Sequence, residues 1–214
     1  MKQRKVFEQD GTVFGRGLGF FDAIYGFAIT LLIANVDMPP AQAWSSLDTL
    51  LDHGLADQLL GFFVSFVVIA VFWRHNADLL GDFRGMDGVI ITMNLAAAAL
   101  IVLLPFTTQG ISDPGVSDYP LATALYALNI TLLILSQMAL MEVGRARGLL
   151  VDESTPAMRR AFRIDLGTQA GVFLLSIPVA YLIAPDVARL SWLVVLPLVA
   201  VVTGRWRASV AARQ

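Results

Sequence analysis

Long apolar runs are the feature that most constrains what this chain can fold into. A bilayer core about 30 Å thick is crossed by an α-helix of roughly 20 mostly apolar residues. The sequence offers six candidates for such spans, at residues 20–38, 59–73, 89–106, 121–141, 166–184 and 191–204. The second and sixth runs are short, so we expect their helices to extend into the flanking residues.

The composition supports this interpretation. Hydrophobic residues make up 57% of the 214 residues and charged residues 15%, whereas soluble domains carry roughly 45–50% and about 25%. We therefore expect an all-α, polytopic membrane protein that forms a single six-helix transmembrane domain over residues 1–214, with lipid as a partner. The chain has no cysteine, two histidines and no basic stripe, so we expect no metal, no cofactor and no nucleic-acid partner.

The positions of the basic residues predict the orientation of these spans. Loops on the cytoplasmic side of a membrane are enriched in Lys and Arg. If the six spans alternate in direction, every one of the 15 basic residues except Arg189 falls on the same side. We therefore expect a multi-pass protein of the cell's inner (plasma) membrane, with both termini in the cytoplasm.

The segment 39–58, between the first two spans, has helical character. Leu47, Leu50, Leu51 and Leu55 recur at helical spacing, and Trp44 suits a membrane interface. These residues favour a short amphipathic helix on the outer membrane surface. An ordered loop without membrane contact is the alternative.

The first span has one face that is small or polar. At about 100° per residue, this stripe lies within a narrow sector and has Phe27 on the same side; it consists of Gly19, Ala23, Gly26, Thr30, Ala34 and Asp37. Small residues allow helices in lipid to pack closely. The same face could instead line a water-filled path, and the spacing alone leaves both interpretations open.

Several polar groups fall at one depth near the cytoplasmic interface. Arg16 and Asp22 flank the start of the first span, His75 ends the second, and Asn94 lies near the start of the third. A carboxylate at the head of an apolar span is costly unless it has partners. We therefore expect a polar network that includes an Arg16–Asp22 pair. The alternative is that each of these side chains extends separately to the membrane interface.

Three stretches of the sequence resemble the TMEM175 family in its prokaryotic branch. The first is R-G-L-G-F-F-D at 16–22, similar to the family's R-x-x-x-F-S-D. The second is S-F-V-V-I-A-V-F-W-R-H-N at 65–76, an apolar span that ends in Trp and His. The third, at 93–108, opens on Asn-Leu and closes on L-P-F-T-T. The likeness covers the first three helices well, whereas the later helices agree mainly in number and length.

This resemblance implies a potassium-permeable cation channel that is a homotetramer with six helices per subunit and the first helix lining a central pore. By position, it places the apolar constriction at Phe27, with the pore face continuing through Thr30 or Leu31 toward Ala34. It places Arg16, Phe20 and Asp22 in a cytoplasmic-side structural network, with His75 and Asn94 as further members. No T-V-G-Y-G filter occurs in the sequence, and potassium is the expected permeant ion.

Two residues depart from the family's pattern. The motif's serine is Phe21 here, which removes a hydroxyl from the network, and Phe27 stands where the family usually has an aliphatic residue. Four phenylalanines around an axis could close a path by dewetting or rotate aside as a gate. A non-conducting membrane protein that keeps the channel fold is therefore one alternative function.

Two other classes of function fit the sequence less well. A small secondary transporter would show related halves and a site near the midplane of the membrane, and no convincing repeat relates residues 1–107 to 108–214. An enzyme would need catalytic side chains that converge at depth. The middle of every expected span lacks Asp, Glu, Lys, Arg and His, so we expect no enzymatic activity.

Overall fold

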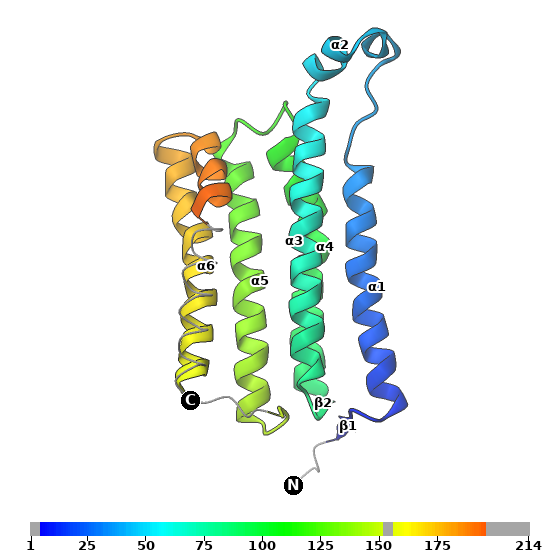
Figure 1. Cartoon of the computed structure of the whole chain (residues 1–214), viewed down its shortest axis with the longest axis vertical. Coiled ribbons are helices and arrows are strands. Elements are labelled where there is room, and N and C mark those ends of the chain that lie inside the picture. Colours follow the sequence, from blue (N-terminus) through cyan, green and yellow to red (C-terminus); the bar gives the residue numbers. More distant parts are fainter. Residues whose placement is uncertain (1–4, 152–155, 196–214) are drawn as a thin grey trace.

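The computed structural model describes residues 5–151 and 156–195, and these form a row of long helices (Figure 1). The long helices are α1 (Thr12–Ala34), α3 (Leu55–Gly81), α4 (Gly88–Ser112), α5 (Pro120–Ala146) and α6 (Pro156–Leu182). The helix α1 packs on α3 and α4, α4 packs on α5, and α5 packs on α6. The helix α1 therefore lies at one edge of the row and α6 at the other.

Within the described residues, five helices are long and apolar enough to cross a membrane, and they correspond to the first five predicted spans. Several predicted bounds differ from the helices. The second span extends from 59–73 to Leu55–Gly81, and the fifth begins at Pro156 rather than 166. These extensions carry charged residues that stand beyond the apolar run. The first span was predicted to end at 38, but α1 ends at Ala34, so Asp37 lies beyond the helix. Residues 185–195 are helical, and most of the predicted sixth span lies outside the described residues.

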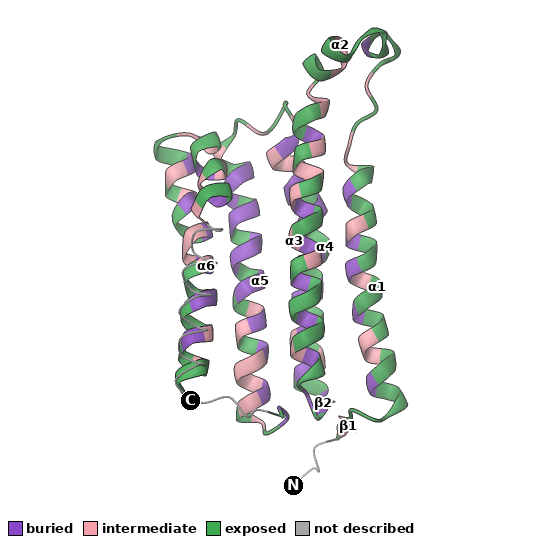
Figure 2. Ribbon diagram, viewed as in Figure 1, coloured by how far each residue is buried: buried purple, intermediate pink, exposed green. Residues whose placement is uncertain are grey.

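Two hydrophobic clusters hold the row together. The larger one joins all five long helices through residues such as Leu32, Ile69, Leu104 and Leu133. The smaller one lies toward one end and centres on Phe83, Met86 and Leu140. Figure 2 shows buried residues on the facing sides of the helices and exposed residues along their outer sides. In lipid, such contacts stabilise through close packing, because exposed apolar side chains are already in an apolar solvent.

A short antiparallel sheet, which the sequence did not predict, closes one end of the bundle. The strand β1 (Val6–Glu8) pairs with β2 (Gly85–Asp87), which is the link between α3 and α4. The segment after α5 pairs with the same link. Phe83 and Leu150 form an isolated antiparallel β-bridge, and the Arg84 backbone amide donates to the Leu149 carbonyl at 2.8 Å. We call this end of the bundle the β1–β2 end.

The opposite end carries η1 (Ala41–Ser45) and α2 (Leu47–Asp52), which project beyond the long helices (Figure 1). The helix α2 begins with a capping box, in which Ser46 and Thr49 bond each other's backbone amides. The predicted short helix is therefore present. Trp44 is 59% exposed and Leu47 69% exposed, so both present apolar surface, and their contact with a membrane stays a prediction.

Charge is distributed unevenly between the two ends. Along the described chain, Arg189 is the sole Lys or Arg at the α2 end. The other described basic residues lie at or near the β1–β2 end: Lys5, Arg16, Arg74, Arg84, Arg145, Arg147, Arg159, Arg160 and Arg163. The fold therefore brings together the basic residues that the alternation of spans had placed on one side.

Candidate pore-lining face and polar network

The helix α1 has two opposite faces of different character. One face is buried against α3 and α4 and carries Phe14, Phe21, Tyr25, Ala28 and Leu32. These residues recur at intervals of three, four and seven, which is the spacing of a single helix face. The small and polar stripe identified from the sequence lies on the opposite side of the helix.

Every residue of that stripe is exposed in the single chain (Figure 2). Phe27 protrudes from it and is 71% exposed, and Leu31 is 46% exposed. Thr30 and Ala34 are exposed as well, and the Thr30 hydroxyl donates to the Phe27 carbonyl at 2.8 Å. The four predicted pore residues therefore share the unpartnered side of α1.

Both ends of α1 are tied to the rest of the bundle. At the β1–β2 end, β1 leads directly into α1 and is held by its pairing with β2. At the α2 end, the side-chain Nδ2 of Asn35 donates to the Pro105 carbonyl of α4 at 2.7 Å, and the backbone amide of Asp37 donates to Gln58 Oε1 of α3 at 2.7 Å. These bonds fix the rotation of α1 and hence the direction of its exposed face.

The partner of Asp22 is Trp73, which was not among the predicted network residues. The indole Nε1 of Trp73 on α3 donates to Asp22 Oδ1 at 2.8 Å. Among the described residues, no ion pair joins Asp22 to Arg16, so the expected pair is corrected. The reason is geometric: six residues of helix separate them by about 9 Å along the axis and by about 120° around it.

A layer of buried polar side chains crosses the bundle near the Asp22–Trp73 contact. Gln137 of α5 donates its side-chain amide to the Phe72 carbonyl of α3 at 3.2 Å. The Tyr25 hydroxyl lies next to the Gln137 side chain but does not meet hydrogen-bond geometry. Gln137 therefore links α5 to α3 directly beneath the buried face of α1.

Two asparagines on adjacent helices belong to the same region. Asn76 of α3 is 3% exposed and Asn94 of α4 is 1% exposed. Each lies about two turns or less from the α3–α4 link, so the two are at similar depth. Within the described chain, Asn76 Oδ1 and Asn94 Nδ2 find no hydrogen-bond partner. An acceptor and a donor thus face the protein interior at similar depth, and membership of Asn94 in a network stays a prediction.

His75 and Phe20 are exposed, unlike these buried groups. His75 is exposed and lines a cavity between α3, α5 and α6. Phe20 is 56% exposed and makes an edge-on contact with Phe21, with ring centroids 5.8 Å apart. The five residues predicted to form one network therefore occupy several locations, and their structural role stays a prediction.

An ion pair at the β1–β2 end was not anticipated either. Asp87, which is 1% exposed, accepts from the amides of Val89 and Ile90 at 3.1 Å and so caps α4. Arg147, just after α5, donates to Asp87 Oδ2 through Nε at 2.7 Å and lies 2.6 Å away through Nη2. Burial raises the pKa of Asp87, but the Ile90 amide and the Arg147 guanidinium outweigh it and hold the pKa below its usual range.

A metal site would need several His, Cys, Asp or Glu side chains close together. Within residues 5–151 and 156–195, no three of these side chains come together. Many of the described polar groups near the spans are amides and hydroxyls that bond to neighbouring helices, as Asn35, Thr108 and Gln137 do, and such bonds hold helices against one another.

Comparison with known proteins connects these features to one family. Residues 16–105 match the family model described as the endosomal/lysosomal potassium channel TMEM175. A potassium channel of Chryseobacterium sp. (strain P1-3) is 26% identical over 109 residues, which cover 51% of this chain and 54% of that protein. The match therefore spans about half the length of that relative.

Two further proteins extend the comparison. A potassium channel of Streptomyces collinus is 27% identical over 177 residues, covering 80% of this chain and 84% of that protein. The crystal structure of a lysosomal potassium-selective channel TMEM175 homologue from Chamaesiphon minutus superposes with a TM-score of 0.73 at 19% identity. That superposition covers 90% of this chain and 98% of the other, so the fold is shared well beyond the first three helices.

Proposed function

Because this chain is related to the TMEM175 family, we propose that it forms a potassium-permeable cation channel. The observation that carries this proposal is the two-sided character of α1. One side is packed on α3 and α4, while the other exposes a stripe of small and polar residues along the helix. A single copy of α1 at the edge of a bundle cannot enclose a path, so several copies of the chain must meet along this face.

The proposed assembly is a homotetramer with four α1 helices around a central axis. Ala23, Gly26 and Thr30 would keep the path open, because their side chains are short. Phe27 is 71% exposed, which makes it the most exposed large side chain on this face, so we place the narrowest point there. Thr30 retains oxygen lone pairs while donating to the Phe27 carbonyl, and it can therefore face water or a cation.

The distribution of basic residues also supports an orientation in the membrane. The β1–β2 end carries the described basic residues except Arg189, and basic residues favour the cytoplasmic side. In the proposed arrangement, this end faces the cytoplasm, the chain spans the cell's inner (plasma) membrane, and α2 lies on the outer side. Potassium passes between the subunits without a bound cofactor.

The proposal is tested by potassium flux from liposomes that contain the purified protein. Native protein is compared with Phe27→Ala and with the matched control Phe63→Ala, which removes a phenylalanine of similar exposure from α3 (61% exposed). We expect flux in the native protein, a change in flux with Phe27→Ala and no change with Phe63→Ala. Flux that occurs only after Phe27→Ala would mean that the four rings close a real path.

One result would favour the alternative function. If folded oligomers of both the native protein and Phe27→Ala show no flux, the chain keeps the channel fold without conducting. Phe27 is the residue that supports this alternative, because a circle of apolar side chains around an axis can exclude water from a pore.

A further inference from the structure

A cavity of about 440 Å³ lies between α3, α5 and α6 at the β1–β2 end. It is on the side of the bundle away from the exposed face of α1, since α6 and α1 stand at opposite edges of the row (Figure 1). Its volume is within the range of about 300–1,000 Å³ typical of small-molecule pockets. The proposed channel does not use this cavity.

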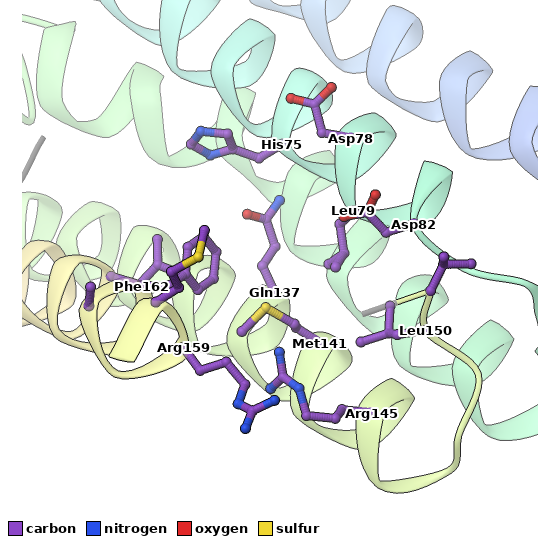
Figure 3. A pocket seen from close by; sticks show the side chains of 14 residues that line it. His75, Asp78, Leu79, Asp82, Gln137, Met141, Arg145, Leu150, Arg159 and Phe162 are labelled. Atoms are coloured by element: carbon purple, nitrogen blue, oxygen red, sulfur yellow. The ribbon is translucent and has the colours of Figure 1, made fainter. Parts of the chain in front are cut away.

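The walls of the cavity carry opposite charges. Asp78 and Asp82 extend from α3 on one side, and Arg145 and Arg159 extend from α5 and α6 on the other (Figure 3). Asp78 approaches Arg74 only at 3.9 Å, with both side chains more than 70% exposed, so that pair is weak. Arg145 lies 3.1 Å from Glu142, but a guanidinium has five N–H donors and can serve a carboxylate and a phosphate together.

The deeper part of the cavity is largely apolar. Met141, Phe162 and Leu166 line it together with the polar side chains of Gln137 and His75. Gln137 lies nine residues before the end of α5, which is about 14 Å into the helix, whereas Arg145 lies in its last turn. The charged part of the cavity is therefore at the level of lipid headgroups, and the apolar part reaches toward the acyl chains.

We propose that this cavity binds a phospholipid with a zwitterionic, primary-amine headgroup, such as phosphatidylethanolamine. The phosphate lies against Arg145 and Arg159, the ammonium against Asp78 and Asp82, and an acyl chain against Phe162 and its apolar neighbours. A purely anionic headgroup would meet repulsion from the two carboxylates, and a purely cationic ligand would meet repulsion from the two guanidiniums. A primary ammonium also donates hydrogen bonds to carboxylates, which a quaternary choline group cannot do.

The binding is tested by native mass spectrometry of the intact protein. Detergent-solubilised protein is mixed with equal amounts of phosphatidylethanolamine, phosphatidylglycerol and phosphatidylcholine that have identical acyl chains, and the lipid retained per subunit is measured. We expect phosphatidylethanolamine to be retained in excess over the other two. Equal retention of all three lipids, or a preference for phosphatidylglycerol, would overturn the proposal.

Three variants assign the preference to this cavity. Arg159→Gln should lower retention of both phosphatidylethanolamine and phosphatidylglycerol by about two- to fivefold, as expected for one partly exposed ion pair. Asp78→Asn should lower retention of phosphatidylethanolamine alone. Arg160→Gln is the matched control, because Arg160 is the exposed neighbour of Arg159 and does not line the cavity. Loss of binding with Arg160→Gln as large as with Arg159→Gln would contradict the assignment.

A final arm distinguishes a lipid from a soluble ligand with the same headgroup. Glycerophosphoethanolamine carries the phosphate and the ammonium but has no acyl chain. It should stabilise the native protein against thermal unfolding far less than the lipid does at equal concentration. Equal stabilisation would mean that the apolar wall formed by Met141, Phe162 and Leu166 contributes nothing, and the lipid would then be the wrong occupant.

Discussion

The ion pair between Asp87 and Arg147 offers the sharpest test of how the β1–β2 end is held together. Asp87 is 1% exposed and the Arg147 side chain is 28% exposed. Removing one partner of a fully buried pair costs about 3–5 kcal/mol. Because Arg147 keeps some access to water, a discount is required, and we expect Arg147→Gln to lower the free energy of unfolding by about 2–3 kcal/mol.

Substitutions of Asp87 separate its two roles. Asparagine caps helices about as well as aspartate, whereas alanine does not, and a lost cap costs about 1 kcal/mol. Asp87→Asn should therefore remove only the charge interaction with Arg147, at about 1–2 kcal/mol. Asp87→Ala should cost about 1 kcal/mol more, because the amides of Val89 and Ile90 lose their acceptor as well.

The assay is a double-mutant cycle on purified protein, unfolded by titrating a denaturing detergent into a mild one. Native protein, Asp87→Asn, Arg147→Gln and the double variant are compared, and the coupling energy should be about 1–2 kcal/mol. Arg160→Gln, an exposed arginine on α6, serves as a control. If the two single effects add within about 0.3–0.5 kcal/mol in the double variant, the pair contributes no stability of its own and the reasoning is refuted.

Three further predictions concern particular contacts. The pKa of Asp87 is below its ordinary value of 3.8 in the folded chain. The stability that the Asp87 carboxylate contributes should therefore be complete above about pH 4 and be lost as the pH falls through the folded-state pKa. In unfolding measured from pH 6 to pH 3, the difference in unfolding free energy between native protein and Asp87→Asn should narrow, and a constant difference would argue against this prediction. Asp22→Ala and Trp73→Phe each remove the 2.8 Å hydrogen bond between α1 and α3. Each should lower the yield of assembled oligomer, measured by size-exclusion chromatography with light scattering, while Asp22→Asn, which keeps an acceptor, should give a yield near that of the native protein. A native yield for Asp22→Ala would defeat this prediction. A Cβ at Gly144 would lie 2.5 Å from the buried Phe83 ring, so Gly144→Ala should cost about 1–3 kcal/mol and less in a Phe83→Leu background, whereas an equal cost in both backgrounds would exclude this clash.

Helical periodicity is a local property, so the sequence could place the small and polar residues of α1 on one face of that helix. The stripe around Thr30 and the buried line through Tyr25 and Leu32 lie on opposite sides of the helix, as expected from spacing alone. What spacing could not decide is whether the exposed stripe meets water, lipid or another subunit, because that depends on partners outside a single chain.

The polar network was predicted less well because it depends on how neighbouring helices are rotated. Trp73 and His75 are two residues apart, so their side chains point about 160° away from each other around the helix, and a single partner such as Asp22 cannot contact both. Asn76 lies only about 60° from Trp73 and faces the interior, where it is 3% exposed. The periodicity of α3 could therefore have favoured Asn76 over His75.

The β1–β2 end was beyond the reach of local patterns. The strands β1 and β2 have three residues each, too few to show an alternation of apolar and polar residues. Their pairing arises only because the α3–α4 link is brought next to the segment before α1. Likewise, nothing near Arg147 in the sequence indicates that its partner is Asp87, 60 residues earlier.

The most direct test of the central claim uses the absence of cysteine from the sequence. Thr30→Cys places a single thiol on the exposed stripe of α1, and Leu175→Cys places one on the exposed surface of α6, where Leu175 is 69% exposed. Potassium flux is measured before and after a charged, water-soluble thiol reagent is added. If α1 lines the path, the reagent blocks flux through Thr30→Cys and leaves Leu175→Cys unchanged. Persistent flux through Thr30→Cys, despite complete modification of its thiol, would contradict the account.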